Sequence, residues 1–247
     1  MVLSAALLAG TVAAASAQDD TDAPEALPER VLFIGNSHTA RHGGLDWVIE
    51  NMVAAETEPR PFDGTARTEN GVTLEYHYDN GAVNTIRKGD FDAVVLQGYL
   101  PHSRTGTAGS FLEYARLLDK VVRKSGAQTV FFMTWPQGYG DWSTLEDTIE
   151  AHRLISAELD APVAPAALAF ERARAERPDL RLIGDDQIHA TWEGAYLAAA
   201  TVYATLFDRS PEGLSYSFGI SPDDAAFLRR IAWEALEEWR AGEAVEG

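Results

Sequence analysis

The stretch VLFIGNSHT (residues 31–39) joins four consecutive apolar residues to a serine that follows Gly-Asn. A short run that is apolar at every position is typical of a parallel strand covered on both faces. Because such a strand would end at Gly35, the sequence places the Ser37 hydroxyl at the carboxyl edge of a sheet. The alternative is that Asn36 and Ser37 only form a turn and cap the following helix.

The rest of the chain alternates short apolar runs with helical patterns. Further strands are expected over residues 60–67, 92–97, 129–134 and 162–166. Helices are expected over residues 111–124, 144–159, 195–207 and from Ser221 onward. This alternation predicts an α/β fold in which a parallel sheet lies between helices. Ligands of such folds bind beyond the carboxyl ends of the strands.

A candidate base lies far downstream, in Asp186-Gln187-Ile188-His189. The Asp186 carboxylate can accept the Nδ1 proton of His189, which leaves Nε2 free to deprotonate Ser37. Asp185 is a rival for this role, and Asp186 is preferred. Serine, histidine and aspartate together supply the division of labour that covalent acyl transfer needs. The residues therefore predict a serine hydrolase.

These motifs resemble those of the SGNH (GDSL-like) hydrolase superfamily. Its nucleophile motif is usually Gly-Asp-Ser, and Gly35 to Thr39 is similar to a bacterial branch with Gly-Asn-Ser-x-Thr. Its last motif, Asp-x-x-His, matches Asp186 and His189. The resemblance covers about residues 30–210. It implies a three-layer, flavodoxin-like sandwich around a five-stranded parallel sheet in the order 2-1-3-4-5.

The same resemblance implies three donors for an oxyanion hole. The backbone N–H groups of Ser37 and Gly71 supply two of them, because Gly71 matches the glycine of the superfamily's second motif. The third motif normally provides an Asn side chain, but here the corresponding strand ends in Leu96-Gln97-Gly98. The Gln97 amide would therefore have to replace the Asn side chain as a donor.

The leading interpretation is a serine esterase that cleaves carboxylic esters and needs neither a metal nor an organic cofactor. Small acyl or acetyl esters, including esters on a carbohydrate, are the expected small-molecule or glycan substrates. Two alternatives use the same residues. One is transfer of the acyl group to an alcohol or sugar, and the other is a catalytically silent glycan-binding protein on the same scaffold.

Four residues are candidates for the substrate pocket. His38 follows the nucleophile directly, and three aromatic residues follow the strand at 129–134, namely Trp135, Tyr139 and Trp142. These rings can stack on a sugar or enclose an acyl chain. Packing against neighbouring helices is an equally open interpretation.

The remaining histidines do not predict a metal site. His38 and His42 have a spacing that can hold zinc on a helix, but no third ligand follows at a convincing spacing. Gly43-Gly44 also weakens a helix there. His77 and His102 are expected either beside the cleft or on the surface, and His152 on an apolar helix face is expected to be structural.

The composition argues against several kinds of partner. The chain of 247 residues carries a formal net charge of −18, which repels nucleic acid and anionic lipid. It contains no cysteine, so disulfides and a thiol nucleophile are excluded. No apolar run reaches the roughly 18 to 20 residues that a membrane span needs.

The amino-terminal residues have the pattern of an export signal. Residues 2–17 carry no charge and end in Ala15-Ser16-Ala17, a small-x-small cleavage pattern, although no Lys or Arg precedes them. The sequence therefore predicts a signal peptide over residues 1–17, cleaved after Ala17. A flexible acidic leader over 18–29 and a single hydrolase domain over 30–247 would follow, in a periplasmic or secreted protein.

Overall fold

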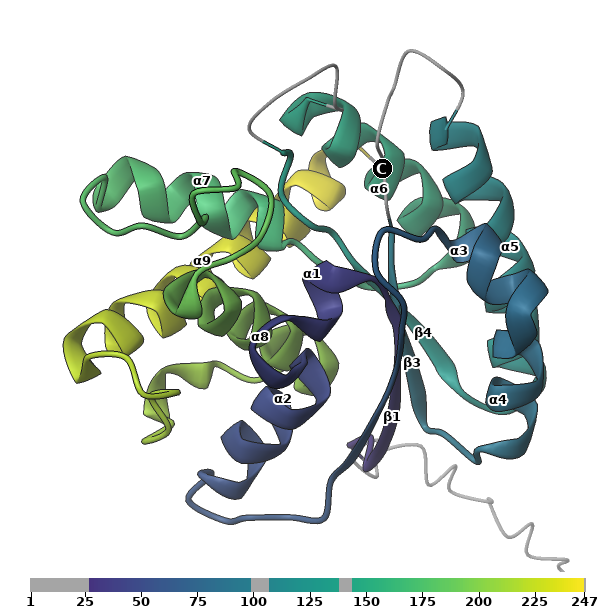
Figure 1. The fold of residues 1–247 in the computed structure, drawn as a ribbon, viewed down its shortest axis with the longest axis horizontal. Coiled ribbons are helices and arrows are strands. Elements are labelled where there is room, and N and C mark those ends of the chain that lie inside the picture. The colour runs from purple at the N-terminus through teal and green to yellow at the C-terminus, as the bar shows by residue number, and fades with distance from the viewer. Residues whose placement is uncertain (1–26, 99–106, 138–143, 247) are drawn as a thin grey trace, which may run out of the picture.

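Five parallel strands form one sheet in the order β2-β1-β3-β4-β5 (Figure 1). The computed structural model describes residues 27–98, 107–137 and 144–246, without the side chains of 107–109 and 243–246. The strands are β1 (Arg30–Gly35), β2 (Asp63–Thr68), β3 (Ala93–Gln97), β4 (Gln128–Phe132) and β5 (Val163–Ala164). The predicted α/β fold and strand order are confirmed. The predicted signal peptide lies outside the described residues.

Helices cover both faces of this sheet (Figure 1). One face packs against α2 (Leu45–Ala54), α7 (Ala166–Glu176), α8 (Trp192–Phe207) and α9 (Pro222–Glu246). The other packs against α3 (Leu74–His77), α4 (Val83–Lys88), α5 (Thr107–Lys124) and α6 (Leu145–Leu159). The short elements are α1 (Ser37–Ala40), a 3₁₀ turn (Arg41–Gly43), a π turn (Tyr78–Ala82) and a second 3₁₀ turn (Pro211–Gly213).

The central strand β1 explains why the sequence run 31–34 has no polar position. Val31 and Phe33 point into the apolar cluster on the α8 side, and Leu32 and Ile34 point into the cluster on the α5 side. All four side chains are 0% exposed. Burial of each such side chain is worth roughly 1.5 to 3 kcal/mol, so this strand anchors the loop that follows it.

The sequence patterns of the two edge strands, β2 and β5, indicate a strand much less clearly than that of β1. β2 reads Asp-Gly-Thr-Ala-Arg-Thr and none of its residues is fully buried. β5 has only two residues, both buried.

Within the described residues, no helix is both long and apolar enough to cross a bilayer.

His152 is a buried histidine in the interior of α6. Its Nδ1 lies 2.8 Å from the Thr148 carbonyl oxygen, and its ring packs against Phe111 with 5.0 Å between centroids. Burial lowers the pKa of His152 from 6.5 to about 4. The imidazole is therefore neutral at pH 7 and serves packing.

This buried imidazole predicts a pH-dependent stability. Between about pH 6.5 and pH 4 the unfolded chain binds a proton at His152 that the folded chain does not bind, so the free energy of unfolding falls as the pH decreases through this window. We expect the free energy of unfolding to fall between pH 7 and pH 5 by roughly 2 kcal/mol less in His152→Gln than in the wild type. Urea unfolding at both pH values measures the difference, and equal losses would contradict a neutral buried imidazole.

Candidate active site

The candidate nucleophile lies where β1 passes into α1. Ser37 is the first residue of α1, and the Asn36 side chain caps this helix by accepting a hydrogen bond from the His38 backbone N–H at 3.1 Å. Gly35 allows the loop to lie close to the next strand, because a Cβ there would come within 2.6 Å of the Gln97 Oε1 atom. The serine hydroxyl therefore sits at the carboxyl edge of the central strand, on a closely packed turn.

The structure brings Ser37, His189 and Asp186 together. His189 Nε2 lies 2.9 Å from the Ser37 Oγ atom, and His189 Nδ1 lies 2.7 Å from the Asp186 Oδ2 atom. The imidazole is thus placed between a hydroxyl and a carboxylate, each within hydrogen-bond distance. This arrangement can remove the serine proton and return it to a leaving group.

The loop before α8 fixes the Asp186 carboxylate. Its Oδ1 atom accepts hydrogen bonds from the backbone N–H groups of Ile188 and His189, both at 3.0 Å. The hydrogen bond from the His189 side chain, followed by these backbone bonds, holds the pKa of Asp186 well below its usual range. An ionised carboxylate at this position keeps the proton of a neutral His189 on Nδ1, which leaves the Nε2 lone pair facing Ser37.

Asp185 does not compete for the histidine. Its side chain is 96% exposed and pairs with Arg181 at 2.7 Å. The two aspartates are adjacent in the chain, but only Asp186 contacts His189 in the described hydrogen bonds. The preference for Asp186 thus has a direct geometric basis.

A cavity of about 410 Å³ opens at the serine. This volume is within the range of small-molecule sites. Its lining includes Ser37, His38, Gly71 and His189, which the sequence singled out. Five further residues line it that the sequence does not single out for the site: Asn36, Arg41, Asn70, Gln137 and Ile188. Of these residues, only Asn70 could have been suspected from its sequence, because the Asn70-Gly71 dipeptide is typical of a turn.

Two backbone N–H groups at this cavity are available to an oxyanion. Ser37 is the first residue of a helix, so its N–H has no acceptor four residues earlier in that helix. Gly71 has φ of +69°, and its N–H donates to no other described residue. The Asn36 Nδ2 atom donates to the Val72 carbonyl at 3.1 Å and thereby ties the Gly71 loop to the nucleophile loop.

No family model matches the sequence, and no curated protein matches it. Solved structures do match. A protein assigned to the SGNH hydrolases from Slackia heliotrinireducens is 21% identical, with a TM-score of 0.60 over 72% of this chain and 98% of that one. The chain therefore has the SGNH hydrolase fold. The fold that the motif resemblance implies is confirmed.

Two further structures share this SGNH fold. A DUF4886 family protein from Bacteroides uniformis is 16% identical, with a TM-score of 0.61 over 85% of this chain and 95% of that one. A catalytic mutant of an acetylxylan esterase from Geobacillus stearothermophilus is 14% identical, with a TM-score of 0.56 over 78% of this chain and 97% of that one. The fold of known hydrolases and esterases thus carries the Ser37 site.

The structure corrects the role predicted for Gln97. On this SGNH fold its side chain lies beneath the nucleophile loop and does not line the cavity. Its Oε1 atom accepts from the Asn36 backbone N–H at 2.8 Å and from the Thr39 hydroxyl at 2.9 Å, while its Nε2 atom donates to the Gly98 carbonyl. Gln97 is 2% exposed and does not line the cavity, so its second amide N–H does not face an oxyanion there, and Gln97 supports the nucleophile loop instead.

Of the three aromatic pocket candidates, only Trp135 belongs to the described residues. Trp135 is 3% exposed, stacks on Phe170 with 4.0 Å between ring centroids, and lies behind His38 without lining the cavity. Packing, rather than stacking on a substrate, therefore accounts for Trp135. Tyr139 and Trp142 lie outside the described residues.

The other histidines support the framework of the site. His77 is buried, and its Nε2 lies 2.8 Å from the Gly35 carbonyl oxygen. His42 Nε2 lies 2.9 Å from the Ala190 carbonyl oxygen, next to His189 in the chain. His102 lies outside the described residues. Among those that are described, no three His, Asp or Glu side chains are grouped so that they could hold a metal ion.

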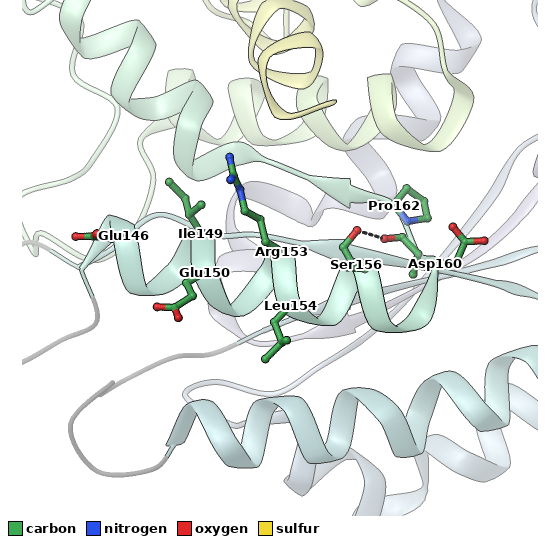
Figure 2. A pocket seen from close by; sticks show the side chains of 10 residues that line it. Glu146, Ile149, Glu150, Arg153, Leu154, Ser156, Asp160 and Pro162 are labelled. Carbon is green, nitrogen blue, oxygen red and sulfur yellow. Dashed lines mark hydrogen bonds between the residues drawn. The ribbon is translucent and has the colours of Figure 1, made fainter. Parts of the chain in front are cut away.

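A larger hollow, of about 930 Å³, lies along α6 and not at the serine (Figure 2). Its rim carries the acidic side chains of Glu146, Glu150 and Asp160. The Ser156 hydroxyl within it donates to the Ala161 carbonyl oxygen at 2.8 Å. None of the residues lining this hollow is a histidine, whereas His189 stands beside Ser37 at the smaller cavity, so the smaller cavity is the better candidate on chemical grounds.

A substitution of Asn36 tests whether its hydrogen bond to Val72 holds the Gly71 loop against the nucleophile loop. In Asn36→Asp, a carboxylate oxygen replaces the Nδ2 donor opposite the Val72 carbonyl, so an attraction becomes a repulsion. We expect kcat for the reaction at Ser37 to fall about tenfold to a hundredfold through displacement of the Gly71 loop. Asn51→Asp is the matched control, because Asn51 only donates to the Trp47 carbonyl on α2. An unchanged kcat in Asn36→Asp would contradict the positioning role.

Proposed function

We propose that the protein hydrolyses small carboxylic esters through an acyl-enzyme on Ser37. The observation that carries this proposal is the geometry of His189, with Nε2 at 2.9 Å from the Ser37 hydroxyl and Nδ1 at 2.7 Å from Asp186. A base that is oriented by a carboxylate and paired with a serine at a cavity is the arrangement that nucleophilic acyl transfer requires.

The reaction follows from these positions. The Ser37 Oγ atom attacks the ester carbonyl carbon while His189 Nε2 takes the serine proton. The N–H groups of Ser37 and Gly71 stabilise the negative charge on the carbonyl oxygen. The ester C–O bond then breaks, and the protonated His189 gives its proton to the departing alcohol. Water, deprotonated by the same His189, then attacks the acyl carbon. The bond between the acyl carbon and Ser37 Oγ breaks, the acid leaves, and the protonated His189 returns its proton to the Ser37 oxygen.

A panel of 4-nitrophenyl esters of graded acyl length tests the proposal. We expect turnover on the shortest esters, because the cavity of about 410 Å³ is small. A fluorophosphonate should label one residue, and peptide mapping should place the label on Ser37. Labelling elsewhere, or no turnover on any ester, would contradict the mechanism. Glycan binding that persists without turnover would favour the silent scaffold.

The same assay separates hydrolysis from acyl transfer. The two reactions share the acyl-enzyme and differ in whether water or another alcohol attacks it. Adding an alcohol or sugar acceptor and measuring the products decides between them. We propose hydrolysis as the main reaction, and a majority of transferred product would reverse that assignment.

Export is part of the proposal. It rests on the uncharged residues 2–17 and the Ala15-Ser16-Ala17 pattern. We expect the protein recovered from outside the cytoplasm of an expressing bacterium to begin at Gln18, as amino-terminal sequencing would show. Protein that keeps Met1 and stays in the cytoplasm would contradict it.

A further inference from the structure

His38 presents an unpaired acceptor to the cavity at Ser37. Its side chain is 7% exposed and lines that cavity. Its Nδ1 atom lies 3.1 Å from the Asn36 Oδ1 atom. The Asn36 amide cannot be reversed, since its Nδ2 donates to the Val72 carbonyl and its Oδ1 accepts from the His38 backbone N–H. The ring proton is therefore on Nδ1, and Nε2 carries a lone pair.

This lone pair has no donor among the described residues. The Ile188 carbonyl, which raises the pKa of His38, is an acceptor rather than a donor and receives the Trp135 Nε1 proton at 2.9 Å. Burial, followed by the neighbouring His189, lowers the pKa of His38 to about 4. The ring thus stays neutral at pH 7 and keeps its need for a donor.

A second acceptor lines the same cavity. The Oε1 atom of Gln137 is buried and has no hydrogen-bond partner among the described residues. Gln137 follows Trp135 by two residues, and the Trp135 ring lies 5.1 Å from the His38 ring between centroids. Two buried acceptors without donors at one cavity are uncommon in folded proteins. Both are satisfied at once if the ligand brings hydroxyl groups.

We propose that His38 Nε2 and Gln137 Oε1 form a subsite that accepts hydrogen bonds from hydroxyl groups on the alcohol part of the ester. The alcohol part is the relevant one because its oxygen takes a proton from His189, whose ring lies 5.7 Å from the His38 ring between centroids. This inference rests on the proposed ester hydrolysis. It narrows the substrate to esters of polyhydroxy alcohols that keep a free hydroxyl near the ester bond.

Two matched esters test the subsite: 2-hydroxyethyl acetate, which can donate a hydrogen bond, and 2-methoxyethyl acetate, which cannot. We expect the wild type to prefer the hydroxyl ester in kcat/KM by roughly three- to tenfold. The preference should fall toward one in Gln137→Leu and in His38→Phe. Gln128→Leu is the matched control and should keep the preference, because Gln128 is exposed at the start of β4, the opposite end of the strand from Gln137.

The outcomes separate this inference from the proposed function. Turnover of both esters at equal kcat/KM by the wild type would overturn the subsite and leave ester hydrolysis standing. If neither ester is turned over, ester hydrolysis fails, and binding of both esters is then compared by ligand-observed NMR. Tighter binding of the hydroxyl ester, lost in Gln137→Leu, would support the subsite. Equal binding of the two esters would overturn it.

Discussion

Replacing Ser37 with alanine is expected to lower kcat for ester hydrolysis by about 10⁴- to 10⁶-fold. The variant loses the hydroxyl that we propose forms the acyl-enzyme, while the cavity and the backbone N–H groups of residues 37 and 71 remain. The residual rate comes from these donors acting on direct attack by water. Steady-state kinetics on the shortest active 4-nitrophenyl ester measure the loss, and KM should change much less than kcat.

Ser125→Ala is the control for this substitution. Ser125 is exposed near the start of β4, at the edge of the sheet away from the cavity, and its hydroxyl only donates to the Val121 carbonyl. Its kcat should equal that of the wild type. A Ser37→Ala protein that retains full activity would rule out the proposed mechanism, whatever the fold.

The central strand and the site motifs were predictable because their signals are local. Four apolar residues before Gly35 specify a strand buried on both faces, and a strand end in a parallel sheet specifies the edge at which Ser37 lies. Asp186 and His189 are three residues apart, so a single turn brings the carboxylate to the imidazole. Because this turn and Ser37 both lie at the carboxyl edge of the sheet, His189 could be predicted to pair with Ser37, although the two are far apart in the chain.

Other elements left no comparable signal. β2 is a half-exposed edge strand with a polar sequence, which alternation cannot identify. α7 buries mostly alanines, so its apolar stripe is weak. α2 begins directly after Gly43-Gly44, two residues that indicate the end of a helix more often than its start.

The direction of the Gln97 side chain could not be predicted from its motif. Its position at the end of β3 is the one that the resemblance assigned to an oxyanion donor. Whether the amide points into the cavity depends on the Asn36 N–H and the Thr39 hydroxyl, which both donate to its Oε1 atom from another element. Side-chain direction of this kind is set by partners about sixty residues away in the chain, and the sequence does not reveal them.

Asp186→Asn is expected to lower kcat by about 10⁴-fold with little change of fold. The backbone N–H groups of Ile188 and His189 both need an oxygen at the Oδ1 position, so the new amide must turn its Nδ2 toward His189. An Nδ2 donor there favours the tautomer with the proton on Nε2 of His189. That nitrogen then donates toward Ser37 and cannot take the serine proton.

Asp185→Asn distinguishes this tautomer effect from a general loss of negative charge. It removes the same charge from the adjacent residue, where the side chain pairs only with exposed Arg181. We expect kcat for Asp185→Asn to stay within about twofold of the wild type, since an exposed ion pair contributes little. Equal losses in the two variants would mean that charge near the loop, and not orientation of His189, is what Asp186 supplies. A large loss confined to Asp186→Asn would identify the carboxylate as the group that sets the proton on His189.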